Sequence, residues 1–136
     1  MPQAGKPTFE IGTDEIEIGM GIHGEPGVWR GKLKPVDEIV DELIERLMFD
    51  MPLSKGDRIS ILVNGAGATP IEELYLDFRC AHALLADKGV EIICPMVGNY
   101  ATSMEMAGAS ITLMKLDDEL ESLLHVPAEN PFWRNL

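Results

Sequence analysis

Hydrophobic and polar residues alternate along residues 15–22, where apolar side chains occupy every second position. A period of two is typical of a strand with one buried face. Over residues 36–49 the apolar positions instead recur every three or four residues, which predicts an amphipathic helix. The apolar, β-branched run at 59–63 predicts a buried strand, and residues 8–11 are expected to form a further short strand.

The second half of the chain continues the alternation of helices and strands. The elements expected there are a helix over residues 70–88, strands over 90–97 and 109–116, and a helix over 117–124. Thr69 is expected to cap the first of these helices, and Gly89 to end it. Residues 98–108 form a polar loop in this prediction, and the tail from Val126 shows no clear element.

The order of elements predicts an α/β fold with a mixed sheet. The last two strands follow one another without room for a long crossover helix, so they cannot both run parallel to the same neighbour. A length of 136 residues is typical of one domain, so residues 1–136 are predicted to form a single domain. Residues 1–8, which are rich in proline and glycine, are expected to be a linker or arm.

Charge and composition narrow the classes of function. The formal net charge is −12 and there is no basic cluster, which argues against a nucleic-acid partner. No apolar run approaches the roughly 20 residues of a membrane helix, and the first residues lack the layout of a secretory signal. We therefore expect a cytoplasmic protein that does not insert in membranes. Cys80 and Cys94 lie in apolar runs without metal-ligand spacing, which favours buried free thiols.

His23 is the residue most open to chemistry. It stands in residues 21–27, GIHGEPG, where glycines on both sides allow another molecule to approach the imidazole closely. The alternative is an ordinary turn histidine with local hydrogen bonds only. Glu25 is a candidate for orienting the ring, whereas His82 and His125 are expected to be structural or solvated.

Two further segments follow predicted strands. Residues 64–70, NGAGATP, would offer free backbone N–H groups to an anion or a polar ligand, or would allow close packing of a helix on a strand. The segment lacks the lysine of a P-loop and the spacing of a dinucleotide-binding loop. Residues 98–103 offer hydroxyl and amide groups but carry little information alone. Neither a metal-ligand cluster nor a Ser-His-Asp order is recognisable.

These motifs, taken together and in this order, resemble the K domain of the dihydroxyacetone kinase family. The matching segments are residues 17–27, 62–75 and 102–113, and the likeness covers roughly residues 8–130. The stretch GIHGEPG is its most specific part. The resemblance implies the second domain of a DhaK/DegV-like fold, a two-layer mixed sheet with helices on one side, and so the C-terminal half of the substrate-binding subunit.

The resemblance also implies a chemical role for the loop. His23 would bind the carbonyl carbon of dihydroxyacetone, or of a similar short sugar, as a covalent hemiaminal, with Gly24 and Glu25 near the substrate. The family's general-base aspartate and its other substrate contacts belong to an N-terminal K domain. The nucleotide, ATP or ADP with Mg²⁺, is expected on a partner L domain or subunit, in one branch with a phosphotransferase-system subunit as the ultimate donor.

Two consequences and one alternative follow from this resemblance. The chain alone is expected to lack kinase activity and to contain no metal or cofactor site, and family members are usually dimers. The alternative is a non-catalytic paralogue that binds a ketose as a sensor or co-activator, because such paralogues keep the histidine.

Overall fold

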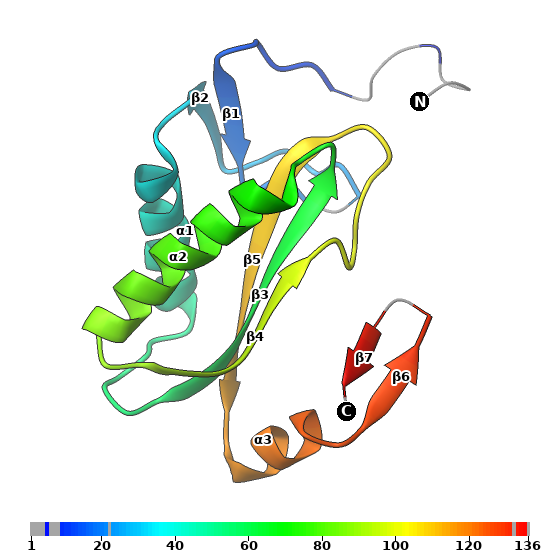
Figure 1. Ribbon diagram of the computed structural model, residues 1–136. Helices are drawn as coiled ribbons and strands as arrows, with labels where there is room; N and C mark the ends of the chain where they lie inside the picture. The colour runs from blue at the N-terminus through cyan, green and yellow to red at the C-terminus, as the bar shows by residue number, and fades with distance from the viewer. Residues whose placement is uncertain (1–4, 6–8, 22, 132, 136) are drawn as a thin grey trace. The chain divides into compact units, whose positions relative to one another are not determined.

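The computed structural model describes residues 5, 9–21, 23–131 and 133–135, and it divides into two compact units, residues 1–35 and 36–136 (Figure 1). The assignment of residues 1–136 to a single domain stays a prediction. Among the described residues, no helix is long and apolar enough to cross a membrane. The cytoplasmic location expected from the sequence also stays a prediction.

The first unit contains a two-stranded antiparallel sheet. Strand β1, Glu15–Ile18, pairs with β2, Trp29–Lys32, and Ile18 lies opposite Trp29 at the end of the ladder. The prediction of a strand over 15–22 was therefore too long. The described part of the strand ends before Gly19, whose φ of +80° turns the chain. Ile22 lies outside the described residues.

Two predictions about the first unit missed short elements. Strand β2 was not foreseen, because four residues with Gly31 among them give too short an alternation to recognise. The strand predicted over residues 8–11 is wrong for the part that the structure describes, since residues 9–11 form no strand. Thr8 and most of the predicted arm, residues 1–8, lie outside the described residues.

The second unit is built on a mixed three-stranded sheet with the order β4-β3-β5. Strand β3, Arg58–Gly67, pairs parallel with β4, Glu91–Gly98, and antiparallel with β5, Ala107–Leu116. Helices α1, Val36–Asp50, and α2, Ile71–Asp87, pack on one face of this sheet (Figure 1). The predicted fold class, α/β with a mixed sheet and helices on one side, is confirmed.

The core lies between the sheet and these two helices. Alternate residues of β3, namely Ile59, Ile61 and Val63, are completely buried, and Val40 and Leu74 meet them from the helices. Each such side chain stabilises the fold by about 1.5–3 kcal/mol through removal of apolar surface from water. The period of two along β3 thus fixes which face receives the helices.

The start of α2 differs from the sequence prediction, whereas the start of α3 agrees with it. The N-cap position of α2 is Pro70 rather than Thr69, and no side chain caps this helix. The Thr69 hydroxyl instead donates to the Gly108 carbonyl and accepts from the Gly108 N–H, both at 2.7 Å. Helix α3, Asp118–Leu124, begins as predicted, with the Asp117 carboxylate accepting the Leu120 N–H at 2.8 Å.

The tail of the chain is more ordered than its sequence suggested. Strands β6, Ala128–Asn130, and β7, Trp133–Asn135, form a short antiparallel hairpin. The Asn135 amide donates to the Leu124 carbonyl at 2.6 Å, which ties β7 to the end of α3. Strands of three residues are too short for a periodic signal, so this hairpin was missed.

Candidate functional site

His23 lies on the loop that joins β1 to β2, as its glycine neighbours predicted. Its side chain is 85% exposed, so the imidazole is open to solvent. The His23 backbone N–H donates to Glu25 Oε2 at 3.1 Å, and the ring Nδ1 lies 3.4 Å from Glu25 Oε1. One carboxylate therefore lies against both the backbone and the ring of the histidine, as expected of an orienting residue.

Backbone hydrogen bonds and glycines shape the turn around His23. The Gly21 N–H donates to the Glu25 carbonyl at 3.0 Å, and the Gly24 N–H donates to the Gly21 carbonyl at 2.9 Å. A side chain at Gly21 would collide with the Glu25 carboxylate. Gly24 has φ +88° and open space where a Cβ would lie, so this position leaves the histidine accessible.

Glu17 holds the base of the loop, and sequence reasoning missed this role. Its Oε1 accepts the Gly27 N–H at 2.7 Å, while Oε2 accepts from Arg30 Nε at 3.1 Å and Nη2 at 2.6 Å. These donors, the Arg30 guanidinium first, lower the pKa of Glu17 below its usual value. Arg30 lies directly opposite Glu17 in the β1–β2 register, so only a prediction of β2 would have found the pair.

The structure decides between the two interpretations of residues 64–70. The segment is largely the end of β3 rather than an open loop. The Gly67 N–H donates to Thr102 Oγ1 at 2.8 Å, and the Ala68 N–H donates to the Met106 carbonyl at 2.7 Å. A Cβ at Gly65 would collide with Asn99 and would lie 2.9 Å from Leu74 Cδ1. The small residues serve close packing, and these two N–H groups are not available to an anion.

The side chain of Asn64 holds the backbone of the segment 98–103 by hydrogen bonds. It is buried, and its Oδ1 accepts the N–H groups of Tyr100 and Ala101, each at 2.8 Å. Its Nδ2 donates to the Ala101 carbonyl at 2.9 Å. The amide side chain thus organises the loop that connects β4 to β5. This loop is held from inside, and the Thr102 and Ser103 hydroxyls accept the N–H groups of Gly67 and Met106.

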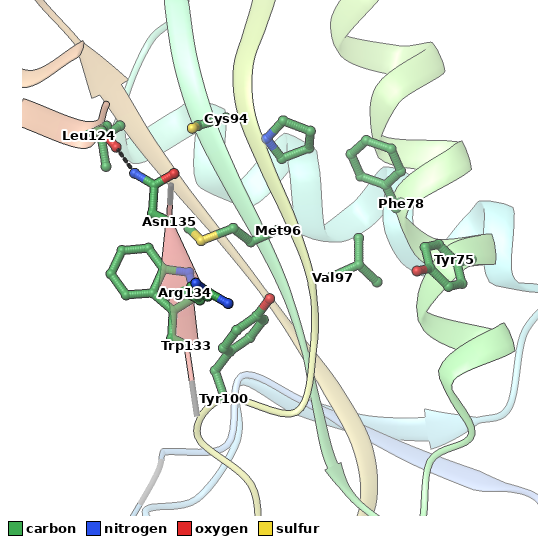
Figure 2. A pocket seen from close by; sticks show the side chains of 11 residues that line it. Tyr75, Phe78, Cys94, Met96, Val97, Tyr100, Leu124, Trp133, Arg134 and Asn135 are labelled. Carbon is green, nitrogen blue, oxygen red and sulfur yellow. Dashed lines mark hydrogen bonds between the residues drawn. The ribbon is translucent and has the colours of Figure 1, made fainter. Parts of the chain in front are cut away.

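The second unit has an open hollow of about 540 Å³, which residues of α2, β4, α3 and β7 line together with Tyr100 (Figure 2). Its walls include Tyr75 and Phe78 of α2 and Trp133 of β7, with Arg134 at the rim. Such apolar walls suit a planar or apolar group. The sequence analysis assigned no function to these residues, which come from distant parts of the chain.

The two cysteines and His82 are in packing or hydrogen-bonding environments that indicate a structural role. Cys80 and Cys94 are free thiols, as predicted. Cys80 is buried, and burial together with its hydrogen bond to Asp37 raises the pKa of the thiol to about 11, so it stays protonated. The His82 ring packs edge-on against Phe78 with a centroid distance of 5.8 Å. Among the described residues, no group of His, Cys, Asp and Glu could hold a metal ion.

Comparison with known proteins gives consistent matches along the chain. Residues 1–132 match the family model described as the Dak1 domain. The chain is 46% identical over 134 residues to the dihydroxyacetone-binding subunit DhaK of PTS-dependent dihydroxyacetone kinase 2 from Listeria innocua. That match covers 98% of this chain and 40% of the relative, so the chain spans about two fifths of the relative's length.

Two further matches differ in function from that subunit. The chain is 38% identical over 138 residues to L-erythrulose kinase from Pectobacterium atrosepticum, which covers 98% of this chain and 23% of the kinase. Among solved structures, the dihydroxyacetone kinase operon co-activator DhaQ superposes with a TM-score of 0.82 at 34% identity. This superposition covers 90% of this chain and 38% of the co-activator.

Proposed function

The chain belongs to the Dak1 domain family, and from this membership we propose that it is the substrate-anchoring part of a dihydroxyacetone kinase, with His23 as the anchor. The observation that carries the proposal is the exposed imidazole of His23, with the Glu25 carboxylate beside its Nδ1. The similarity to a dihydroxyacetone-binding subunit supports the same substrate class for this chain.

The proposed reaction is addition of a ring nitrogen to a ketone. Because Nδ1 faces Glu25, Nε2 is the nitrogen whose lone pair is free to add to the carbonyl carbon. The N–C bond forms as the π bond of the carbonyl opens toward oxygen. The oxygen gains a proton and Nδ1 loses one, so that a neutral hemiaminal results. The Glu25 carboxylate, 3.4 Å from Nδ1, is placed to accept the proton that leaves the ring.

This bond would provide both selection and positioning. A ketone or aldehyde can form it, whereas glycerol cannot, although the two classes differ little in size. Discrimination by shape and hydrogen bonds alone would be weaker. The bond also holds the substrate hydroxyl in one place for phosphoryl transfer, which lowers the entropic cost of that step. In this proposal, Gly24 leaves space beside the ring, and Glu25 sets its orientation.

The substrate class we propose is a ketose of three or four carbons. The match to L-erythrulose kinase supports a range that extends beyond dihydroxyacetone to a four-carbon ketose. The general base and the remaining substrate contacts would come from an N-terminal K domain. The nucleotide with Mg²⁺ would lie on a partner L domain or subunit: ATP in one branch, or ADP that a phosphotransferase-system subunit rephosphorylates in the other.

Formation of the bond can be tested directly by NMR. The chain is labelled with ¹⁵N at histidine and mixed with dihydroxyacetone that carries ¹³C at the carbonyl. A one-bond ¹³C–¹⁵N coupling is expected, because it requires a covalent link and cannot come from the hydrated free ketone. His23→Ala should abolish the coupling, whereas His82→Ala should leave it unchanged. Absence of coupling at saturating ketone when this chain is part of the complete two-domain subunit, or persistence of the coupling in His23→Ala, would rule out the anchor role.

A regulatory ketose-binding function is the second candidate, since the co-activator DhaQ superposes with a TM-score of 0.82. Anchoring of a ketose by His23 is common to both candidates, so the NMR coupling does not separate them. The discriminating measurement is phosphorylation of dihydroxyacetone by the complete subunit with its nucleotide-binding partner. Turnover that disappears in His23→Ala supports the kinase, and coupling without turnover supports the sensor.

A further inference from the structure

We propose that Glu17 is a positioning residue for His23, acting through the backbone N–H of Gly27. Its two carboxylate oxygens serve different parts of the hairpin. Oε1 accepts the Gly27 N–H at 2.7 Å, and Oε2 receives both Arg30 bonds, from Nε at 3.1 Å and from Nη2 at 2.6 Å. The inference rests on the proposed function, in which the orientation of His23 matters for capture of a ketose.

The bond to Gly27 lies beyond the part of the hairpin that backbone pairing already orders. The β1–β2 ladder closes at Ile18 and Trp29, and the Val28 N–H adds one more bond to the Ile18 carbonyl at 2.7 Å. Gly27 is the next residue toward His23, and its N–H is held by the side chain of Glu17. The Glu17 carboxylate therefore holds the first loop residue beyond the backbone pairing in a fixed position.

Packing around Gly27 shows that this contact is specific. A Cβ at this position would lie 2.6 Å from both the Glu17 Cγ and the Ile18 carbonyl oxygen, so no residue with a side chain fits without movement. The Glu17 side chain is only 12% exposed, in contrast to 61% for Glu25. The carboxylate is thus confined between the arginine and the loop backbone rather than free in solvent.

A short covalent path leads from Gly27 to the histidine. Pro26, whose ring restricts φ, separates Gly27 from Glu25. Glu25 in turn accepts the Gly21 N–H through its carbonyl and the His23 N–H through its carboxylate. Displacement of Gly27 would therefore move the residue that lies against the imidazole. Arg30 acts as the fixed support, since its Nη1 also donates to the Glu10 carbonyl at 2.8 Å.

The test compares four variants in the full chain. Glu17→Gln keeps an oxygen acceptor for Gly27, whereas Glu17→Ala removes it. The double exchange Glu17→Arg with Arg30→Glu restores opposite charges at paired positions of the strands but takes the acceptor from Gly27. The matched control is Glu15→Ala, two residues along the same strand, whose carboxylate accepts only the local Gly12 N–H among the bonds described.

Three NMR signals are recorded for each variant: hydrogen exchange of the Gly27 amide, the ¹⁵N shifts of the His23 ring, and the coupling to ¹³C-labelled dihydroxyacetone. Glu15→Ala should resemble the parent chain. Glu17→Gln should fall between the parent and Glu17→Ala, because its single amide oxygen can accept from Gly27 only while its NH2 group faces the donors of Arg30. Glu17→Ala and the double exchange should exchange faster at Gly27, shift the His23 signals and lower the capture equilibrium about tenfold, as loss of one bond to a charged group predicts. The spectrum of residues 36–136 should stay unchanged.

The double exchange separates positioning from simple stabilisation of the hairpin. If it restores the His23 signals and capture to those of the parent while Glu17→Ala does not, the cross-strand ion pair is what matters, and the inference is overturned. It is equally overturned if Glu17→Ala leaves the His23 signals unchanged. If the complete parent subunit shows no coupling, the proposed anchor role fails, while the Gly27 and His23 signals still decide whether Glu17 positions the loop.

Discussion

The loop that joins β1 to β2 and the loop that joins β4 to β5 both carry polar residues, yet they use their polar groups in opposite ways. In the β4–β5 loop, the backbone of Tyr100 and Ala101 is hydrogen-bonded to the buried side chain of Asn64. In the β1–β2 loop, carboxylates hold the backbone and His23 stays exposed. Polarity alone therefore does not mark a site; the availability of the polar group after folding does.

The largest contrast is expected from deletion of one polar side chain in each loop. His23→Ala should abolish addition of dihydroxyacetone and change the free energy of unfolding by less than about 0.5 kcal/mol, since the side chain is exposed. Capture is measured by the ¹³C–¹⁵N coupling and stability by urea denaturation. A stability loss comparable to that of a buried polar residue would contradict the division between the two loops.

Asn64→Ala should show the reverse pattern. The substitution removes four hydrogen bonds of a buried side chain, one of them a long one to Ser110, and leaves the N–H groups of Tyr100 and Ala101 without their acceptor. We expect a loss of about 3 kcal/mol in the free energy of unfolding. Urea denaturation monitored on the second unit measures it, and the His23 ring signals should not change. A loss below 1 kcal/mol would show that water replaces the side chain.

Two glycine substitutions refine the comparison on a smaller scale. Gly65→Ala would push a methyl group into Asn99 and Leu74, with an expected cost of about 2 kcal/mol from overpacking. Gly24→Ala meets open space but places a side chain at φ +88°, with an expected cost of about 1 kcal/mol. Thermal unfolding of the two variants side by side gives the order. Equal costs would mean that Asn99 and Leu74 move aside to accept the methyl group at Gly65.

The smallest expected effect concerns Asp77 on α2. Burial, and secondarily the charge of Glu73, raises the pKa of Asp77 from 3.8 to about 6. The folded chain then binds a proton that the unfolded chain has released, so this residue makes stability fall as pH rises from about 4 to about 6. Asp77→Asn should stabilise the chain by about 1 kcal/mol at pH 7.5, a value reduced for partial exposure, and by nothing at pH 3.5.

Denaturation of Asp77→Asn and the parent chain at both pH values measures this difference. A gain that is equal at pH 7.5 and pH 3.5 would show that it comes from helix propensity rather than from the charge.

Sequence patterns predicted those helices and strands in which the spacing of apolar residues repeats over several periods. The helix over Val36–Asp50 and the core of β3 follow from the spacing of apolar residues, because each spans several periods. Strand β2 and the tail hairpin were missed because three or four residues carry no period. Sequence resemblance supplied the fold family, which composition and periodicity alone did not.

At the candidate site, too, local sequence patterns predicted the nearby residues but not the contacts between distant ones. The exposure of His23 follows from its glycine neighbours, and Glu25 was within reach of local reasoning. The contact of Glu17 with Gly27 and Arg30 joins residues ten and thirteen positions apart, so it depends on a strand pairing that the sequence did not reveal. The role of Asn64 likewise depends on a loop more than thirty residues away.

The close fit around Gly27 has a practical consequence for anyone who wishes to redesign this hairpin for a larger carbonyl compound. Glu17, Gly27 and Arg30 constitute a frame that should be left intact, because a Cβ at Gly27 has no space. Gly24, where nothing crowds a Cβ, can be varied first, at the cost of about 1 kcal/mol that its φ of +88° imposes on any side chain. A library confined to such open positions would explore new specificities while the register of the two strands is retained.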